Sequence, residues 1–301
     1  MRLYKLIGLE IEALQAEHEE TMKNIALYKD ILDNYDSMAA VIIKDMDAIK
    51  KEYGRKRRTA IENAEEAVYE EKKMEEMEVC FLMDRFGYMK LIDKNAYERN
   101  KEAVHNENKY VFNCMNTDKI CIFTDTGKMH TIKAVDIPLG RFRDKGTPVD
   151  NLSNYDSSQE RMLYVAPVGQ LRSDRLLFVT KTSMCKLVEG AEFDVAKRTI
   201  ASTKLADEDE LIFIGSASEM EQIVLQSHGG CFLRFLTQEV STMKKTALGV
   251  RGMKLADDDY LEHAYLLAGH QEYTISYHDK EYALNKVRLA KRDTKGIKPR
   301  I

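Results

Sequence analysis

The chain has 301 residues, of which 44% are hydrophobic and 32% are charged, and its formal net charge at pH 7 is −4. This length allows a sizeable core and more than one domain, and this composition excludes an intrinsically disordered chain. A net charge this small does not by itself indicate a nucleic-acid binder, so the distribution of charge along the chain carries more information.

The first 53 residues show helical periodicity. A turn signal at Asp33–Ser37 separates two helical stretches, and Gly54 ends the second one. Two helices joined by a short turn pack antiparallel, so we predict an antiparallel helical coiled-coil arm over residues 1–58. The heptad seam that supports this prediction consists of Ile7, Ile11, Leu14, His18, Thr21, Ile25, Tyr28 and Leu32.

A charged linker is predicted over residues 59–77. It follows the basic cluster Arg55–Arg58 and is mostly acidic, and a charge run of this kind is typical of a solvated connector. Residues 1–77 contain 13 Lys and Arg against 18 Asp and Glu. The remaining residues therefore carry a slight positive excess, gathered mainly in loops.

From Val79 onward the sequence consists of short β-rich runs with a repeated pattern of apolar run, turn and return strand. A repeat of 40 to 56 residues with several short strands is typical of the blades of a propeller, in which neighbouring units stabilise one another. We therefore predict an all-β, propeller-like ring of about five blades over residues 78–301. The alternative is a chance series of hairpins in an ordinary sandwich. The predicted turn positions, three of them glycine as positive φ favours, are Gly87, Gly127, Ser183, Gly230 and Glu281.

Basic residues recur after the hairpins of the later repeats, whereas the loop of residues 95–109 after the first hairpin is polar. Ring geometry places equivalent loops on one edge, and a curved positive edge binds and bends duplex DNA through its phosphates without reading bases. The alternative for each cluster is ordinary surface solubility. The candidate DNA-binding residues are Arg141, Arg143, Lys145, Lys197, Arg198, Lys204, Lys244, Lys245, Arg251, Lys254, Arg288, Lys291, Arg292, Lys295 and Lys298.

No catalytic or metal-binding constellation is evident. The acids of Leu205–Glu210 (LADEDE) and Leu255–Tyr260 (LADDDY) are expected to form equivalent turns, and the spaced histidines His263, His270 and His278 are expected to be structural. Five cysteines without a CxxC pair indicate reduced packing residues in a cytosolic protein. No signal peptide or membrane span is expected.

Four stretches of the chain resemble one known protein family. RLYKLIGLE, IKKEYGRKRRTAI, KGTPVDNL and LGVRGMKL, in this order, resemble the C-terminal part of the A subunit of bacterial type IIA topoisomerases, which are DNA gyrase and topoisomerase IV. The resemblance implies the end of a coiled-coil arm followed by a β-pinwheel whose basic edge binds and bends duplex DNA. An α + β multidomain chain is therefore expected.

Two departures from the family refine this expectation. Gyrase A subunits carry a basic box, Q-R-R-G-G-K-G, after the first hairpin, and the corresponding region here reads YERNKEAVHNENKY, so topoisomerase IV-like relaxation or decatenation matches better than supercoiling. The nucleophilic tyrosine of the family follows an arginine, and none of the 15 tyrosines here does. The chain is therefore expected to be inactive alone.

The resemblance also implies partners and cofactors. These partners are duplex DNA, the ATPase B subunit, the A-subunit cleavage core, and a second A subunit in an A2B2 holoenzyme in the cytoplasm, without membrane contact. Magnesium and ATP would act elsewhere in the holoenzyme, and no cofactor or metal is expected on this chain. The alternative function is a propeller-like protein interaction module without DNA binding.

Overall fold

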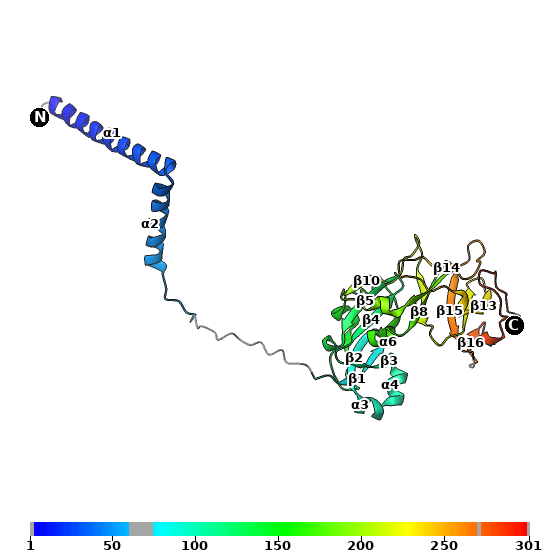
Figure 1. Cartoon of the computed structure of the whole chain (residues 1–301). Helices are drawn as coiled ribbons and strands as arrows, with labels where there is room; N and C mark the ends of the chain where they lie inside the picture. The colour runs from blue at the N-terminus through cyan, green and yellow to red at the C-terminus, as the bar shows by residue number, and fades with distance from the viewer. Residues whose placement is uncertain (1–2, 60–74, 270–271, 300–301) are drawn as a thin grey trace. The chain divides into compact units, whose positions relative to one another are not determined.

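The computed structural model describes residues 3–59, 75–269 and 272–299 (Figure 1). The chain forms two compact units, Met1–Lys72 and Lys73–Ile301. The first contains two long helices, and the second contains every strand in the described residues. Most of the predicted linker, residues 59–77, lies outside the described residues.

The first unit consists of α1 (Leu3–Asp33) and α2 (Tyr35–Tyr53). Asn34 separates them as an N-cap, because its side-chain oxygen accepts a hydrogen bond from the backbone N–H of Asp36 at 3.1 Å. Gly54 follows the last residue of α2, and its N–H donates to the carbonyl of Lys50. The predicted turn and helix end are confirmed.

The apolar seam of these helices is exposed. Leu14 and Tyr28 on α1 are 64% and 60% exposed, Ile42 on α2 is 53% exposed, and α2 has no buried residue. Such a stripe is normally covered in a folded protein. Antiparallel pairing along the seam is therefore not observed in the described helices, and the coiled-coil arm stays a prediction.

The second unit is built from five antiparallel sheets among the described residues. The first is ordered β3 (Asn108–Met115), β1 (Glu78–Asp84), β2 (Tyr88–Asp93), β6 (Thr147–Pro148). The second is ordered β10 (Thr199–Ala201), β5 (Lys128–Lys133), β4 (Lys119–Thr124), β7 (Met162–Pro167). The third is ordered β11 (Leu211–Ser216), β8 (Arg175–Thr180), β9 (Met184–Glu189), β14 (Val250–Arg251).

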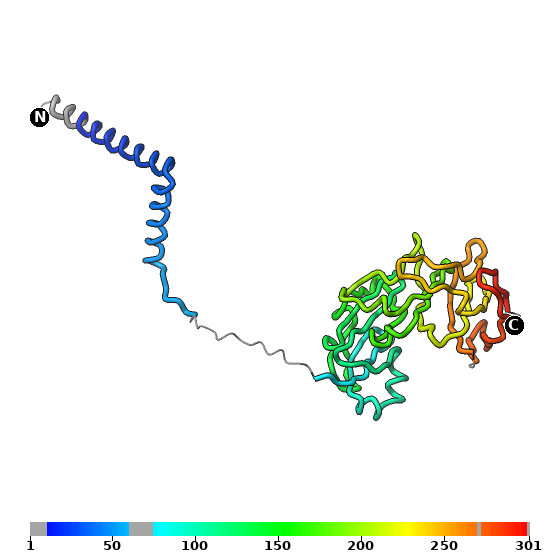
Figure 2. Tube along the Cα trace, viewed as in Figure 1, coloured from blue at the N-terminus to red at the C-terminus, as the bar shows by residue number. Residues whose placement is uncertain are grey.

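The last two sheets contain fewer strands. The fourth is ordered β13 (Phe232–Leu236), β12 (Gln222–Ser227), β15 (Leu261–Leu267), and the fifth is the hairpin β16 (Thr274–Tyr277) and β17 (Lys280–Ala283). Figure 2 shows the main chain of this unit passing from one sheet to the next, from cyan to red. The propeller-like architecture is confirmed, and the number of blades in a complete ring stays a prediction.

Short helical segments connect the strands. They are the α-helices α3 (Lys94–Arg99), α4 (Lys101–Glu107), α5 (Val149–Leu152) and α6 (Val168–Leu171), and the 3-10 helices η1 (Ala134–Asp136), η2 (Gly190–Phe193), η3 (Thr237–Glu239) and η4 (Leu284–Lys286). No helix in the described part of the chain is long and apolar enough to span a membrane.

Four of the five predicted hairpin turns are confirmed by positive φ angles, which are 83° at Gly87, 73° at Gly127, 72° at Ser183 and 78° at Gly230. The fifth prediction, Glu281, is wrong, because that residue lies within β17. The last turn instead uses two left-handed residues, at 278 and 279, between strands of only four residues.

The loop predicted over residues 95–109 is also corrected, because it contains α3 and α4. The Asp93 carboxylate accepts a hydrogen bond from the N–H of Ala96 at 2.8 Å and caps α3. Asn100 ends α3 and begins α4. These caps, together with good helix formers such as Lys, Ala and Glu, explain why a polar stretch becomes helical.

The hairpins exchange strands with their predecessors. β6 follows the hairpin β4–β5 but pairs with β2 of the first sheet, and β10 follows β8–β9 but pairs with β5. β14 follows β12–β13 but pairs with β9, and Ile297 after β16–β17 bridges to Phe232 in β13. We call residues 137–148, 194–201, 240–251 and 287–298 the first to fourth exchanged segments.

Each pair of neighbouring sheets encloses a hydrophobic core. Phe81 of β1 and Ile122 of β4 lie in the core between the first two sheets, and Phe123 and Phe178 lie in the next one, with ring centroids 6.2 Å apart. Two further clusters fill the spaces between sheets three and four and sheets four and five. Each inner sheet packs one face against each of its two neighbours. A single hairpin repeat separated from the array would therefore leave both faces of its sheet exposed.

Candidate nucleic-acid interface

The exchanged segments form the outer edge of the second unit. The strands β3, β7, β11 and β15 contact one another in succession, so they lie on the inner side of the sheets. β6, β10 and β14 occupy the opposite end of the strand order in their sheets. A basic residue on an exchanged segment therefore lies on the outer side.

Most of the predicted DNA-binding cations are exposed on these segments. Within the described residues their side chains form no ion pair with a carboxylate, which leaves their charges available to a polyanion. Two of them, Lys204 and Lys254, lie just after the second and third exchanged segments. The residues of this kind are Arg141, Arg143, Lys145, Lys197, Arg198, Lys204, Lys244, Lys254, Arg288, Lys291, Lys295 and Lys298.

Two other predicted cations hold the loops in place. The Lys245 side chain donates to the Glu192 carbonyl at 3.0 Å, while the Lys245 N–H donates to the Glu192 carboxylate at 3.1 Å. Arg292 makes the equivalent pair of contacts with Glu239, at 3.1 and 2.9 Å. These two residues are half-buried, and their main role in the structure is to attach an exchanged segment to a 3-10 helix.

Arg251 differs from both groups. Its guanidinium forms an ion pair with Asp293 of the fourth exchanged segment, and this carboxylate lowers the net charge at that point of the edge. The structure therefore brings twelve of the fifteen predicted residues to the outer edge as available charges and assigns contacts within the protein to Lys245, Arg251 and Arg292.

A glycine gives three of the four exchanged segments their shape. Gly146, Gly249 and Gly296 have φ angles of 81°, 105° and 69°. A Cβ atom at Gly249 would lie 2.7 Å from the Cys185 carbonyl oxygen, and Gly146 and Gly296 approach the neighbouring strand in the same way. These positions need glycine both for the left-handed backbone and for close approach.

The second exchanged segment is shorter and lacks this glycine. Its backbone pairs directly with β5, and the Arg198 carbonyl accepts a hydrogen bond from the Thr131 N–H at 2.8 Å. The N–H of Lys204 donates to the Lys245 carbonyl at 3.1 Å, which connects this region to the third exchanged segment. A backbone hydrogen bond therefore connects the second and third parts of the cationic edge.

Sequence reasoning missed the cations that face inward. Lys90 and Lys186 lie on β2 and β9, and their ammonium groups donate to carbonyls of the exchanged segments. The signal for them is a single lysine between two apolar residues of a strand, Met89 and Leu91 for Lys90 and Cys185 and Leu187 for Lys186. A search for exposed basic clusters does not detect such a lysine.

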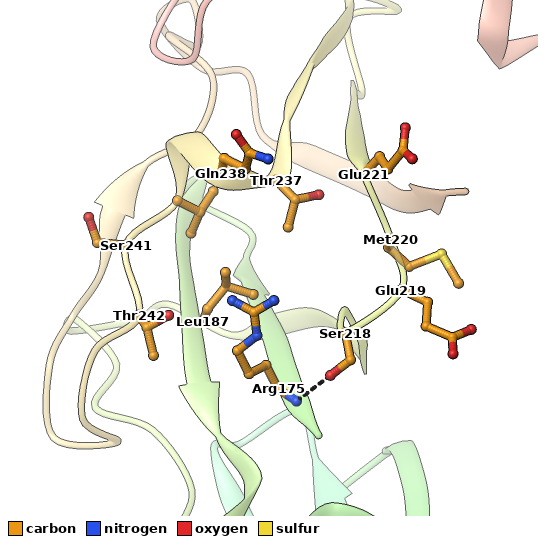
Figure 3. Close-up of a pocket in the computed structure, with 11 residues that line it drawn as sticks. Arg175, Leu187, Ser218, Glu219, Met220, Glu221, Thr237, Gln238, Ser241 and Thr242 are labelled. Atoms are coloured by element: carbon orange, nitrogen blue, oxygen red, sulfur yellow. Dashed lines mark hydrogen bonds between the residues drawn. The ribbon is translucent and has the colours of Figure 1, made fainter. Parts of the chain in front are cut away.

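Two of the open grooves among the described residues contain no catalytic arrangement. One, of about 640 Å³, lies between sheets three and four, with the Arg175 side chain among its lining residues (Figure 3). Ser218 in this groove donates to the Asp174 carboxylate at 2.5 Å and accepts from the Arg175 N–H. None of its lining residues is a histidine or cysteine, so the serine–histidine pair of a typical nucleophilic serine is not formed among them. The other, of about 650 Å³, adjoins the first exchanged segment at Arg143 and Lys145.

The remaining chemistry of the described residues is structural. No group of three or more His, Cys, Asp or Glu there could hold a metal ion. Burial raises the pKa of the Cys185 thiol to about 12, which disfavours a thiolate nucleophile. The two acidic stretches form equivalent turns, as expected. Asp209 and Asp259 accept hydrogen bonds from the N–H groups of Thr182 and Gly229, so each turn also holds a hairpin tip. His270 lies outside the described residues.

The comparisons with known proteins agree with this geometry. A family model for the DNA gyrase C-terminal domain, a β-propeller, matches residues 118–157, 174–218 and 221–268. Each matched segment contains one of the central hairpins, and together they include the first three exchanged segments.

The chain is similar to the A subunits of DNA gyrase. It is 30% identical to that of Clostridium acetobutylicum over 263 residues, covering 84% of this chain and 32% of the relative. It is 26% identical to that of Ureaplasma parvum over 314 residues, covering 99% of this chain and 37% of the relative. The chain thus spans about a third of the length of these relatives.

Solved structures share the fold. The C-terminal domain of a DNA topoisomerase IV superposes with a TM-score of 0.66 at 22% identity, covering 74% of this chain and 73% of that chain. The E. coli ParC C-terminal domain superposes with a TM-score of 0.59 at 13% identity, covering 74% and 94%.

Proposed function

Because this chain belongs to the C-terminal part of the A subunits of type IIA topoisomerases, we propose that its second unit binds duplex DNA along the outer edge and bends it. The observation that carries the proposal is the recurrence of exposed, unpaired cations on four successive exchanged segments. These charges neutralise phosphates and release counterions, without contacts to bases.

The bend follows from the arrangement of the sheets. Cations that lie on the edges of successive sheets contact a duplex at successive phosphates, and a duplex must curve to reach all of them. Such a duplex would be presented to the cleavage core of the A subunit, in a holoenzyme with two A and two B subunits. ATP would act at the B subunit, and magnesium outside this chain.

Relaxation or decatenation is the activity that we propose for the holoenzyme. The region after the first hairpin forms α3 and α4 instead of a basic, glycine-rich loop, and this supports DNA presentation without chiral wrapping. The names of the similar relatives favour the second candidate, gyrase-type supercoiling. The test joins this chain to a type IIA core that lacks its own C-terminal region and measures the linking number of relaxed plasmid. Negative supercoiling of the plasmid would support the second candidate, and an unchanged linking number would support relaxation or decatenation.

Salt-dependent binding of a labelled duplex tests the central proposal. The logarithm of the affinity should fall linearly with the logarithm of salt concentration, with a slope of about −0.9 per phosphate neutralised. Unrelated duplex sequences should bind equally. Affinity that barely changes with salt would exclude the phosphate track. Failure to be retained on immobilised plasmid, together with capture of a protein partner, would favour the interaction-module alternative.

A further inference from the structure

Two inward-facing lysines, one buried and one half-buried, hold the loops that carry the cations. Lys186 on β9 is only 2% exposed, and its Nζ donates to the carbonyls of Lys245 and Ala247 at 2.8 and 2.7 Å. Lys90 on β2 makes the same contacts in the first sheet, with the carbonyls of Phe142 and of Asp144, the latter at 2.5 Å. Each lysine thus binds two carbonyls of a segment that comes from the next hairpin.

The two sets of contacts are equivalent. Lys90 and Lys186 each lie three residues after the left-handed turn residue of their hairpin. The accepting carbonyls lie four and two residues before Gly146 in one loop and before Gly249 in the other. A chance contact would not recur at the same register on both partners, so this is a feature of the repeat.

The contacts determine which side chains point outward. Carbonyls of alternate residues turn inward to the ammonium group, and the residues between them are exposed. In the third exchanged segment Lys244, Thr246 and Leu248 are exposed, while Lys245 and Ala247 are half-buried. Because a buried ammonium group without partners is costly, lysine and loop are constrained by one another.

The other sheets provide natural comparisons. His130 occupies the equivalent position in the second sheet, and its Nδ1 lies 3.1 Å from the Thr199 hydroxyl of the exchanged strand. Leu233 occupies it in the fourth sheet, where two bridges, Phe232 to Ile297 and Arg234 to Leu289, join the exchanged segment to the sheet. There the cation comes from the next residue, because the Arg234 guanidinium donates to the Val287 carbonyl at 3.0 Å.

We propose that Lys90 and Lys186 are positioning residues for DNA binding: they contact no DNA, and they set the affinity of the exposed cations by holding the carbonyls beneath them. This inference rests on the proposed function for its DNA-binding consequence. Its structural half, that the lysines order the exchanged segments, stands separately.

Hydrogen exchange tests the structural half. In Lys186→Met, the amides of residues 244–250 should exchange about tenfold faster, as expected for losing charge-assisted hydrogen bonds, while the other sheets keep their protection. Lys181→Met is the control, since it removes a lysine of the same hairpin whose Nζ pairs with the Glu210 carboxylate at 2.9 Å and not with the loop. Unchanged exchange in the loop, or an equal increase across the whole second unit, would overturn the proposal. Lys90→Met repeats the test at residues 141–146, where the lysine is only half-buried.

A double-mutant cycle tests the functional half. Lys186→Met and Lys244→Gln should each weaken duplex binding several-fold. The double variant should bind no more weakly than the weaker-binding single variant, because Lys244 contributes little to the affinity once its loop is displaced. Additive losses would show that Lys186 acts independently of the loop and would overturn the positioning role. If the wild-type chain binds no duplex, the proposed function fails, and the exchange measurements still decide the structural half.

Discussion

Arg251 and Asp293 form a two-point ion pair between successive exchanged segments, with an Nε to Oδ1 distance of 2.5 Å and an Nη2 to Oδ2 distance of 3.1 Å. The hydrogen bond from Arg251 is the largest cause that lowers the pKa of the Asp293 carboxyl, so this group stays ionised near neutral pH. The pair neutralises a cation that sequence analysis assigned to DNA. It also connects the third segment to the fourth.

Removal of this acid should strengthen DNA binding. In Asp293→Asn, Arg251 becomes available to a phosphate, so the salt dependence of binding should steepen by about 0.9 in slope and the affinity at low salt should rise. Asp257→Asn is the matched control, since it removes an exposed acid that forms no ion pair among the described residues. Equal gains in the two variants would indicate a general charge effect. Gel-shift titration over a salt series measures both.

Neighbouring lysines of the third exchanged segment should behave differently. Lys244→Gln should lower duplex affinity and leave the free energy of unfolding within about 0.5 kcal/mol, because Lys244 is exposed. Lys245→Gln should cost about 1 kcal/mol of stability, since its side chain holds the Glu192 carbonyl. Urea unfolding and duplex titration of both variants check this. The opposite assignment of the two effects would contradict the division of roles.

The left-handed glycines should resist substitution. Gly249→Ala introduces a Cβ atom 2.7 Å from the Cys185 carbonyl oxygen at a φ of 105°, and we expect a loss of about 2 kcal/mol or more. Gly169→Ala is the control, because its Cβ atom would have no contact closer than 3.9 Å and its φ is not left-handed. The shift of the urea midpoint should be confined to the first variant.

The buried lysine should make stability depend on alkaline pH. Burial lowers the pKa of Lys186 from 10.5 to about 8, so between these values the unfolded chain binds more protons than the folded chain. The stability of the wild type should therefore rise with pH relative to Lys186→Met, with a slope of at most about 1.4 kcal/mol per pH unit, and the difference should be constant below pH 8. A pH-independent difference in urea unfolding would contradict this origin of the shift.

Local signals in the sequence were sufficient for the hairpins. Gly127 and Gly230 mark turns because a left-handed backbone favours one residue type, and even Ser183 was located by its spacing from an apolar run. Glu281 was misplaced because the last hairpin has shorter strands. The helices α3 and α4 could have been found from the capping residues Asp93 and Asn100.

The contacts between repeats could not be predicted in the same way. In the sequence, Arg292 is indistinguishable from the other basic residues of its cluster. In the structure, its backbone N–H and its guanidinium donate hydrogen bonds to Glu239, which is far away in the chain. The exchanged strands β6 and β14 contain two residues each, too few for a periodic pattern. The sequence therefore identified the basic residues of the outer edge, whereas the contacts that hold the exchanged segments are visible only in the structure.

Because of strand exchange, the chain of one hairpin repeat contributes strands to two sheets. Opening of β8–β9, for example, disrupts the third sheet and also releases Thr199–Ala201 from β5 of the second sheet. Unfolding of one repeat should consequently destabilise its neighbour. We therefore expect the second unit to unfold cooperatively rather than one repeat at a time.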